Sequence, residues 1–370
     1  MHGLPAPAEL FGVAYRLGRD AKGDEEALLD GWLRGASTGE LVALAAAART
    51  SFSRGLWAEH VPLNAPIDPA RLTSVAPHAT VAVAALLTLH RSGFMRELGL
   101  RELSTTHDPL AVPFLLLRAD DIVDGLRELA VTEILARLTP SFDAAFARCL
   151  GILELLRGRT RGAGGPLVKA VHAFLAHPVH REALAAACFG DDPGVRRAAF
   201  TLRLRNEPVV GVLEGALSDR DTAIRGWAAR LSVSRALTDD DKRALLPLLD
   251  ASSSAFKRML ALRAHQQLGD PDATLDAALL DPHTSVRHDA RRLLKARHPD
   301  RAYGEARKEA LAVLTNTAEA NPSAARLVGA LGALADVGLQ VDHDVVRPFT
   351  SDARPRVRAE AKRTLALLDA

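Results

Sequence analysis

The sequence predicts an all-α protein, built as a right-handed α-solenoid of stacked helical hairpins. A recurring motif predicts this fold: an Asp lies six residues before an Arg that opens a helix rich in small residues. Repeats of roughly 30 residues are typical of stacked hairpins. The composition agrees, because 48% apolar but only 4% aromatic residues favour closely packed helices. Alternating β-branched runs are missing, and no Asn-Gly or Asp-Gly pair lies between two such runs as in a hairpin, so strands are not predicted. The motif occurs as Asp219…Arg225, Asp281…Arg287 and Asp352…Arg358.

Residues 1–71 are predicted to form an atypical N-terminal helical cap. Helices are expected over 8–19, 24–34 and 38–54, whereas three prolines predict an extended stretch over 60–70. The end of a solenoid must cover the apolar flank of its neighbour, so an irregular terminal unit is expected. A separate N-terminal functional module is the alternative.

The remaining chain is predicted as two groups of paired helices, 72–156 and 167–370, separated by a flexible Arg/Gly loop over 157–166. Helix starts are marked by Asp-Pro pairs such as Asp192-Pro193, in which a carboxylate caps free amides and proline lacks one. The expected pairs are 72–90 with 93–104, 108–118 with 121–138, 142–157 with 166–176, 179–189 with 193–205, 208–217 with 221–236, 240–250 with 253–268, 272–280 with 284–297, 303–318 with 323–336, and 342–350 with 354–368.

The segments 219–231, 281–294 and 352–365 resemble HEAT repeats of the short bacterial kind, also called HEAT-like or phycobilisome-lyase-type repeats. The resemblance implies a HEAT-like or armadillo-type superhelix. In that family the turn Asp and the helix Arg form a hydrogen-bonded ladder between stacked repeats. That role is therefore implied for Asp219, Arg225, Asp281, Arg287, Asp352 and Arg358. The repeats at 253–268 and 321–338 depart from the pattern.

A second arginine follows the first basic position of several repeats by five residues. At that spacing it points away from the core, and equivalent positions on stacked repeats form a row. Such a row suits a phosphate backbone or an acidic protein surface. An ordinary solvated face, offset by nearby carboxylates, is the alternative. The candidate basic stripe consists of Arg203, Arg230, Arg263, Arg292 and Arg363.

A second candidate is the loop that carries Arg157, Arg159 and Arg161 among glycines. Backbone amides with arginines can bind an anion, although a plain linker has the same composition. Nucleophile-elbow, zinc-protease and dinucleotide motifs are missing, and so is the ligand spacing of a structural zinc site. We therefore predict no catalytic residue, no metal, no cofactor and no small-molecule substrate.

The functional expectation follows from the repeats. Acidic residues outnumber basic ones in 1–150, and the reverse holds in 151–370. No apolar run is long enough to span a membrane, and a signal peptide is not apparent, so a cytoplasmic location without membrane contact is expected. Solenoids usually hold another macromolecule, which predicts a non-enzymatic scaffold or adaptor that binds a protein, favourably an acidic one, on its concave surface. The alternative is a nucleic-acid-binding HEAT-like protein, of the DNA glycosylase-like kind, that uses the basic stripe. A phycobilin lyase-like activity has support from fold analogy alone.

Overall fold

The computed structural model describes residues 23–51, 80–158, 164–299, 301–316 and 322–369, together with a few isolated positions before residue 23. All regular secondary structure in these ranges is helical, which confirms the all-α prediction. The chain divides into two compact units, Met1–Pro208 and Val209–Ala370. The expected helix 8–19, the extended stretch 60–70 and residues 159–163 of the loop lie outside the described ranges.

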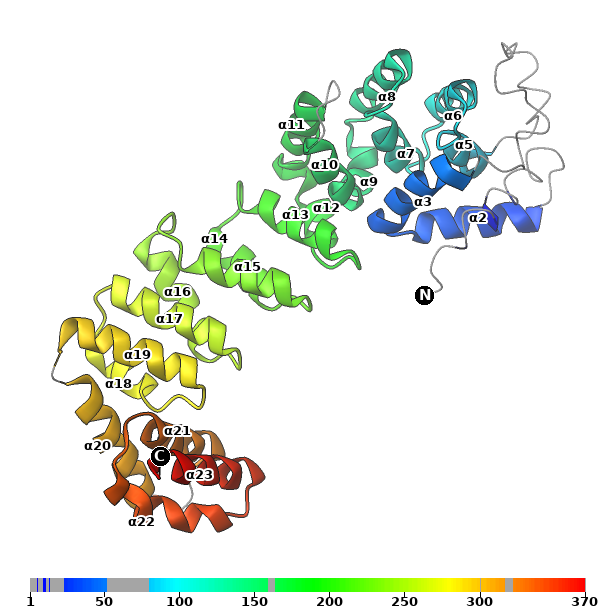
Figure 1. The fold of residues 1–370 in the computed structure, drawn as a ribbon. Helices are drawn as coiled ribbons and strands as arrows, with labels where there is room; N and C mark the ends of the chain where they lie inside the picture. The colour runs from blue at the N-terminus through cyan, green and yellow to red at the C-terminus, as the bar shows by residue number, and fades with distance from the viewer. Residues whose placement is uncertain are drawn as a thin grey trace. The chain divides into compact units, whose positions relative to one another are not determined.

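Unit 1 consists of short helices that pack mainly as sequential pairs. Helix α5 packs against α6, α7 against α8, α10 against α11, and α12 against α13 (Figure 1). Helix α3 lies against α7 and α10. The helices are α2 (Gly23–Gly35), α3 (Thr38–Ser51), α5 (Val81–Leu87), α6 (Gly93–Thr105), α7 (Ala111–Arg118), α8 (Asp124–Ala136), α9 (Asp143–Arg148), α10 (Leu150–Arg157), α11 (Gly164–Leu175), α12 (Arg181–Ala187) and α13 (Pro193–Arg203), with 3-10 turns η2 (Pro140–Phe142) and η3 (Pro178–His180).

The helix predicted over 142–157 is wrong in one respect, because the structure breaks it in two at Cys149. The backbone of Cys149 has φ −92° and ψ 8°, outside the helical region. Its amide divides its hydrogen bond between the carbonyl oxygens of Ala145 and Phe146. The break redirects α10 toward α11 and α13, against both of which it packs.

Unit 2 continues the paired arrangement. Helix α14 packs against α15, α16 against α17, α18 against α19, and α20 against α21, which also contacts α23. In Figure 1 these pairs run from green α14 to red α23. The helices are α14 (Val209–Leu217), α15 (Thr222–Ser232), α16 (Asp239–Asp250), α17 (Ala255–Gln267), α18 (Asp272–Ala278), α19 (Thr284–Arg297), α20 (Ala302–Thr315), α21 (Ala324–Val337), α22 (His343–Val346) and α23 (Pro355–Leu368), with 3-10 turns η4 (Gln340–Asp342) and η5 (Arg347–Ser351).

The helix predicted over 342–350 also differs from the structure. Only His343–Val346 is α-helical, and the chain continues as η5. Pro348 lies in the first turn of η5 and has no amide proton to donate. If α22 continued through Pro348, a carbonyl oxygen would lack its donor, whereas the first turn of a separate helical segment needs no amide at that position.

Side chains from successive helices form the cores of unit 2. Leu275, Leu279 and Leu293 belong to one buried cluster, and Leu331 and Val357 to another. The predicted cap at Asp192 is confirmed, and Asp221 is a second cap that was not predicted from the sequence. Asp192 accepts the amides of Gly194 and Val195, and Asp221 accepts those of Ala223 and Ile224.

Candidate functional site

One arginine near the start of the second helix closes the turn of many pairs. Its Nη1 atom donates to the carbonyl oxygen six residues earlier, at 2.7 to 3.1 Å. The carbonyls of such turns lack helical partners, and a guanidinium offers several donors in a rigid fork. Among the described residues, these turn arginines and their acceptors are Arg96 with His90, Arg127 with Asp121, Arg196 with Gly190, Arg225 with Asp219, Arg258 with Ser252, Arg287 with Asp281, and Arg358 with Asp352.

The sequence motif assigned three of these arginines to the ladder and missed the other four. The sequence does contain a pattern that identifies all seven, because a small buried residue follows each turn arginine by three positions, on the same helix face. A larger side chain there would push the helix away from its neighbour. The small residues are Gly99, Ala130, Ala199, Ala228, Ala261, Ala290 and Ala361.

Two of the implied ladder arginines keep their hydrogen bonds within their own turn. Arg225 donates to the carbonyl oxygens of Asp219 and Arg220 at 2.7 and 2.9 Å. Arg358 does the same with Asp352 and the following alanine, at 2.7 and 2.8 Å. In both cases the Asp supplies its backbone oxygen to the arginine. These contacts stabilise a turn, and they do not join neighbouring pairs.

Contacts between neighbouring pairs do occur, from other donors. Arg258 of α17 reaches the carboxylate of Asp281 in the next turn with Nε and Nη2, at 2.6 and 2.8 Å. In unit 1, Arg96 of α6 holds Asp121 in the same bidentate way, at 2.8 and 2.9 Å. Burial alone would raise the pKa of Asp121, but hydrogen bonds and the charges of Arg96 and Arg118 hold it below its ordinary value. These carboxylates are structural cross-links.

Arg287 is the most enclosed of the turn arginines, since its side chain is 0% exposed. Its Nε donates to Asp336 of α21 at 2.9 Å, and Arg291 shares that carboxylate at 2.8 Å. A Cβ at Gly332 would lie 2.6 Å from Nη1 of Arg287, so glycine is needed for this approach. The repeat at 321–338, which departs from the Asp-to-Arg motif, therefore has no turn arginine of its own. Instead, its Asp336 accepts a hydrogen bond from Arg287, the turn arginine of the preceding repeat.

The candidate basic stripe is largely neutralised by nearby carboxylates. Arg263 Nε lies 2.8 Å from Asp289, and Arg292 binds the other oxygen of that buried carboxylate at 2.9 Å. Arg363 pairs with Glu360 at 2.7 Å.

The two remaining stripe arginines differ from each other. Arg203, in unit 1, makes two hydrogen bonds to Glu207 at 2.8 and 2.7 Å. Arg230 is exposed and lies over the Phe256 ring, 5.7 Å from its centroid. Within the described ranges it has no carboxylate partner.

The candidate loop is described at both ends, and its predicted boundary at residue 166 is wrong, because residues 164–166 already form the start of α11. Arg157 ends α10 and pairs with Glu154 at 3.1 Å, whereas Arg159 and Arg161 lie outside the described residues.

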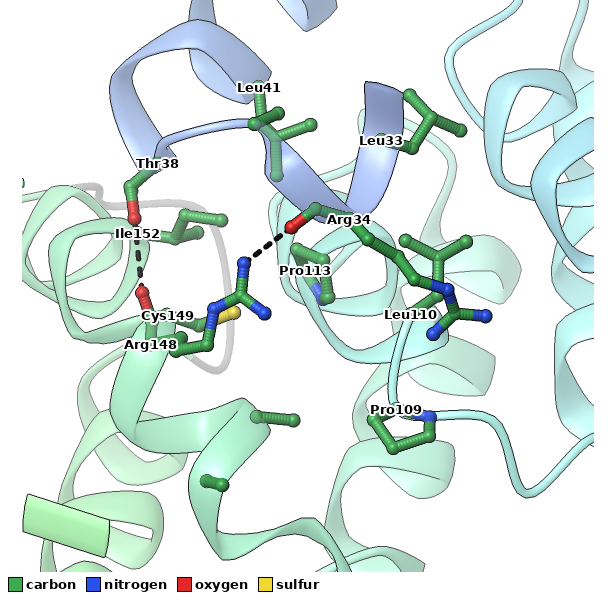
Figure 2. Close-up of a pocket in the computed structure, with 13 residues that line it drawn as sticks. Leu33, Arg34, Thr38, Leu41, Pro109, Leu110, Pro113, Arg148, Cys149 and Ile152 are labelled. Carbon is green, nitrogen blue, oxygen red and sulfur yellow. Dashed lines mark hydrogen bonds between the residues drawn. The ribbon is translucent and has the colours of Figure 1, made fainter. Parts of the chain in front are cut away.

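Unit 1 contains a groove beside the turn between α2 and α3. It has a volume of about 520 Å³, and half of its lining residues are glycine or alanine. Three carboxylates, Glu40, Asp191 and Asp192, face a single guanidinium, that of Arg148. Figure 2 shows the adjoining smaller cavity, of about 180 Å³, which shares Arg148 with the groove.

Arg148 lines both the groove and the smaller cavity and links α9 to the α2–α3 turn. Its Nη2 donates to the carbonyl oxygen of Arg34 at 2.6 Å, and its own carbonyl accepts from Thr38 Oγ1 at 3.1 Å (Figure 2). Arg34 is itself held by both oxygens of Asp108. The α2–α3 turn is thereby tied to α9 at a defined distance, which keeps the groove open.

An exposed aromatic side chain adjoins the groove. Phe189 is 83% exposed and directly precedes Gly190, which lines the groove. Phe189 itself does not line the groove, but aromatic side chains are enriched in protein interfaces, and its exposed ring offers an anchor for a partner that reaches the groove.

Groups suited to covalent or metal chemistry do not gather in the described part of the chain. No cluster of three or more His, Cys, Asp or Glu side chains there is arranged to hold a metal ion. Complete burial raises the pKa of the Cys149 thiol to about 12, which keeps it protonated and unreactive. No described helix has the length and apolar character needed to cross a bilayer.

These contacts define an all-α protein of paired helices, stabilised by turn arginines and buried carboxylates. No protein-family model matches the chain, and no curated protein matches it.

Proposed function

We propose that this chain is a HEAT-like helical-repeat scaffold, solenoidal in its repeats, that binds another protein and has no catalytic role. Support comes from the recurrence of the turn arginine with a small residue three positions later, which gives seven of the described pairs the same closed turn. Repeats of this kind expose continuous surfaces that suit macromolecular partners.

The observation that carries the proposal is Phe189 beside the groove of unit 1. Aromatic side chains are enriched in protein interfaces, and an exposed phenylalanine beside a groove offers a partner an apolar anchor. Alanine and glycine walls let a partner's backbone approach closely. The carboxylates at the groove favour a partner segment that carries positive charge.

The stripe supports a second contact, with an acidic surface of the partner, only at Arg230. Arg263, Arg292 and Arg363 already bind carboxylates, so a phosphate backbone would have to displace those ion pairs. This cost makes nucleic acid the weaker alternative.

The proposal is tested by affinity recovery of the tagged chain from its native host, with and without nuclease. Phe189→Ser is compared with Val341→Ser, which changes a side chain of unit 2 that is 72% exposed. We expect one stoichiometric protein partner, insensitive to nuclease, that Phe189→Ser loses and Val341→Ser retains. Recovery of nucleic acid alone, or equal retention in both variants, contradicts the proposal.

A further inference from the structure

A second cavity in unit 1 lies along one face of α11. The helix contributes wall residues that recur at intervals of three and four and therefore share one face. They are Gly165, Val168, Lys169, His172, Ala173 and Ala176. Arg157 and Arg205 complete the lining, and the volume is about 370 Å³.

The surrounding helices hold this cavity in place. Helix α10, which ends at Arg157, packs against both α11 and α13. Beyond α13, the side-chain amide of Asn206 donates to the carbonyl oxygen of Ala176, at the end of the α11 face. Arg205 is thereby fixed beside the same face.

The cavity concentrates positive charge without an acid in its lining. Three cations, Arg157, Lys169 and Arg205, line it, and no carboxylate does. Arg157 pairs with Glu154 outside the lining, at 3.1 Å. Lys169 and Arg205 have no carboxylate partner within the described residues. Like charges held together repel one another, and a bound anion relieves that repulsion.

His172 shows that this charge acts within the cavity. Its residue is 4% exposed, and burial, followed by the charges of Arg157 and Arg205, lowers its pKa to about 4. The imidazole is therefore neutral at physiological pH. Its Nε2 atom is buried without a hydrogen-bond partner, 3.7 Å from Glu154. A neutral imidazole offers one donor and one acceptor, so His172 has unused hydrogen-bonding capacity.

We propose that this cavity binds a phosphate-class oxyanion carried by a small soluble molecule. The guanidiniums of Arg157 and Arg205 match the oxygens of such an ion in a planar fork, and Lys169 adds a compact charge. Gly165 leaves room for the ion, because it lines the cavity and no atom lies within 4 Å of where its Cβ would be. The site is independent of the protein-binding groove.

The test is calorimetric titration of inorganic phosphate into the full chain at constant ionic strength, with chloride as the reference anion. Lys169→Gln/Arg205→Gln should weaken binding at least about tenfold, because charge-assisted hydrogen bonds are lost. Arg101→Gln/Lys308→Gln makes the same charge change at side chains that are both 70% exposed and outside the cavity. This control should bind phosphate as the parent does.

A second readout follows His172 itself. Its imidazole resonance, assigned with His172→Gln, should titrate with a raised pKa when phosphate saturates the site, because an adjacent anion stabilises the imidazolium. Adenosine triphosphate serves as the second probe. Binding tighter than phosphate identifies a nucleotide ligand, and equal binding identifies the phosphate group alone. The proposal is overturned if phosphate binds no better than chloride, if the double cavity variant binds normally, or if the control loses as much affinity.

Discussion

Replacing Arg287 by Met tests how much one turn arginine stabilises unit 2. The substitution keeps an unbranched apolar side chain in a position with no solvent exposure, and it removes the guanidinium. Three hydrogen bonds disappear, to the Asp336 carboxylate, the Asp281 carbonyl oxygen and the Thr284 hydroxyl, at 2.9, 2.9 and 3.1 Å. The carbonyl oxygen of the partly buried Asp281 loses its side-chain donor.

The expected loss follows from the partners that remain. Breaking a buried ion pair typically costs about 3 to 5 kcal/mol, because the remaining charge is left uncompensated. Asp336 keeps Arg291 at 2.8 Å, which reduces this cost toward about 3 kcal/mol. Arg225→Met is the matched control. Arg225 is partly exposed and donates to two backbone oxygens and Thr222, so water can replace its hydrogen bonds at a cost of about 1 kcal/mol.

The assay is urea unfolding followed by the fluorescence of Trp227 in α15 of unit 2. The chain has three tryptophans, so the two others, Trp32 and Trp57, are replaced by Phe in every variant. Arg287→Met should lower the free energy of unfolding by about 2 kcal/mol more than Arg225→Met does. Equal losses in the two variants would refute the argument that burial and the Asp336 carboxylate decide the stabilisation.

Two further predictions concern the packing and the pH response of unit 2. Gly329→Ala should destabilise the protein by about 2 to 3 kcal/mol in urea unfolding, because the new Cβ would overlap a backbone carbonyl oxygen of the α18–α19 turn. Gly304→Ala, which meets no atom within 4 Å, should cause no loss. His265 is partly desolvated, which lowers its pKa, but hydrogen bonds to Asp270 and Asp250 outweigh burial and raise the pKa above its ordinary value of 6.5. The stability that His265 contributes to the folded state is therefore complete below pH 6.5 and is lost as pH rises through the raised pKa. His265→Gln should abolish this decrease in the free energy of unfolding with pH. An unchanged dependence of the unfolding free energy on pH in the variant contradicts the assignment.

The helical pairs could be predicted from the sequence because their signals are local. Asp192 before Pro193 marks a helix start through chemistry confined to a few residues, and the structure places the cap there. The break at Cys149 could not be predicted in this way. Its neighbours are good helix formers, and the backbone departs from helical geometry where α10 turns toward α11 and α13.

The contacts between pairs were harder to predict, since they join residues that are far apart in sequence. The sequence suggested that Asp281 and Arg287 act together, and they do so through the backbone oxygen of Asp281. The carboxylate of Asp281 instead accepts from Arg258, whose repeat lacks the Asp of the motif. Likewise, Gly332 gains its importance only because Arg287 lies against it.

The arginines of this chain fall into three environments, and the difference decides which of them are free to bind a ligand. The turn arginines satisfy backbone oxygens, and most of the stripe arginines satisfy carboxylates such as Asp289. The excess of basic residues in 151–370 therefore does not amount to a continuous positive surface. In unit 1, Lys169 and Arg205, which have no carboxylate partner within the described residues, line a cavity without an acid in its lining. A ligand that seeks positive charge should consequently bind beside α11, and the stripe becomes a binding surface only for a partner able to displace its existing ion pairs.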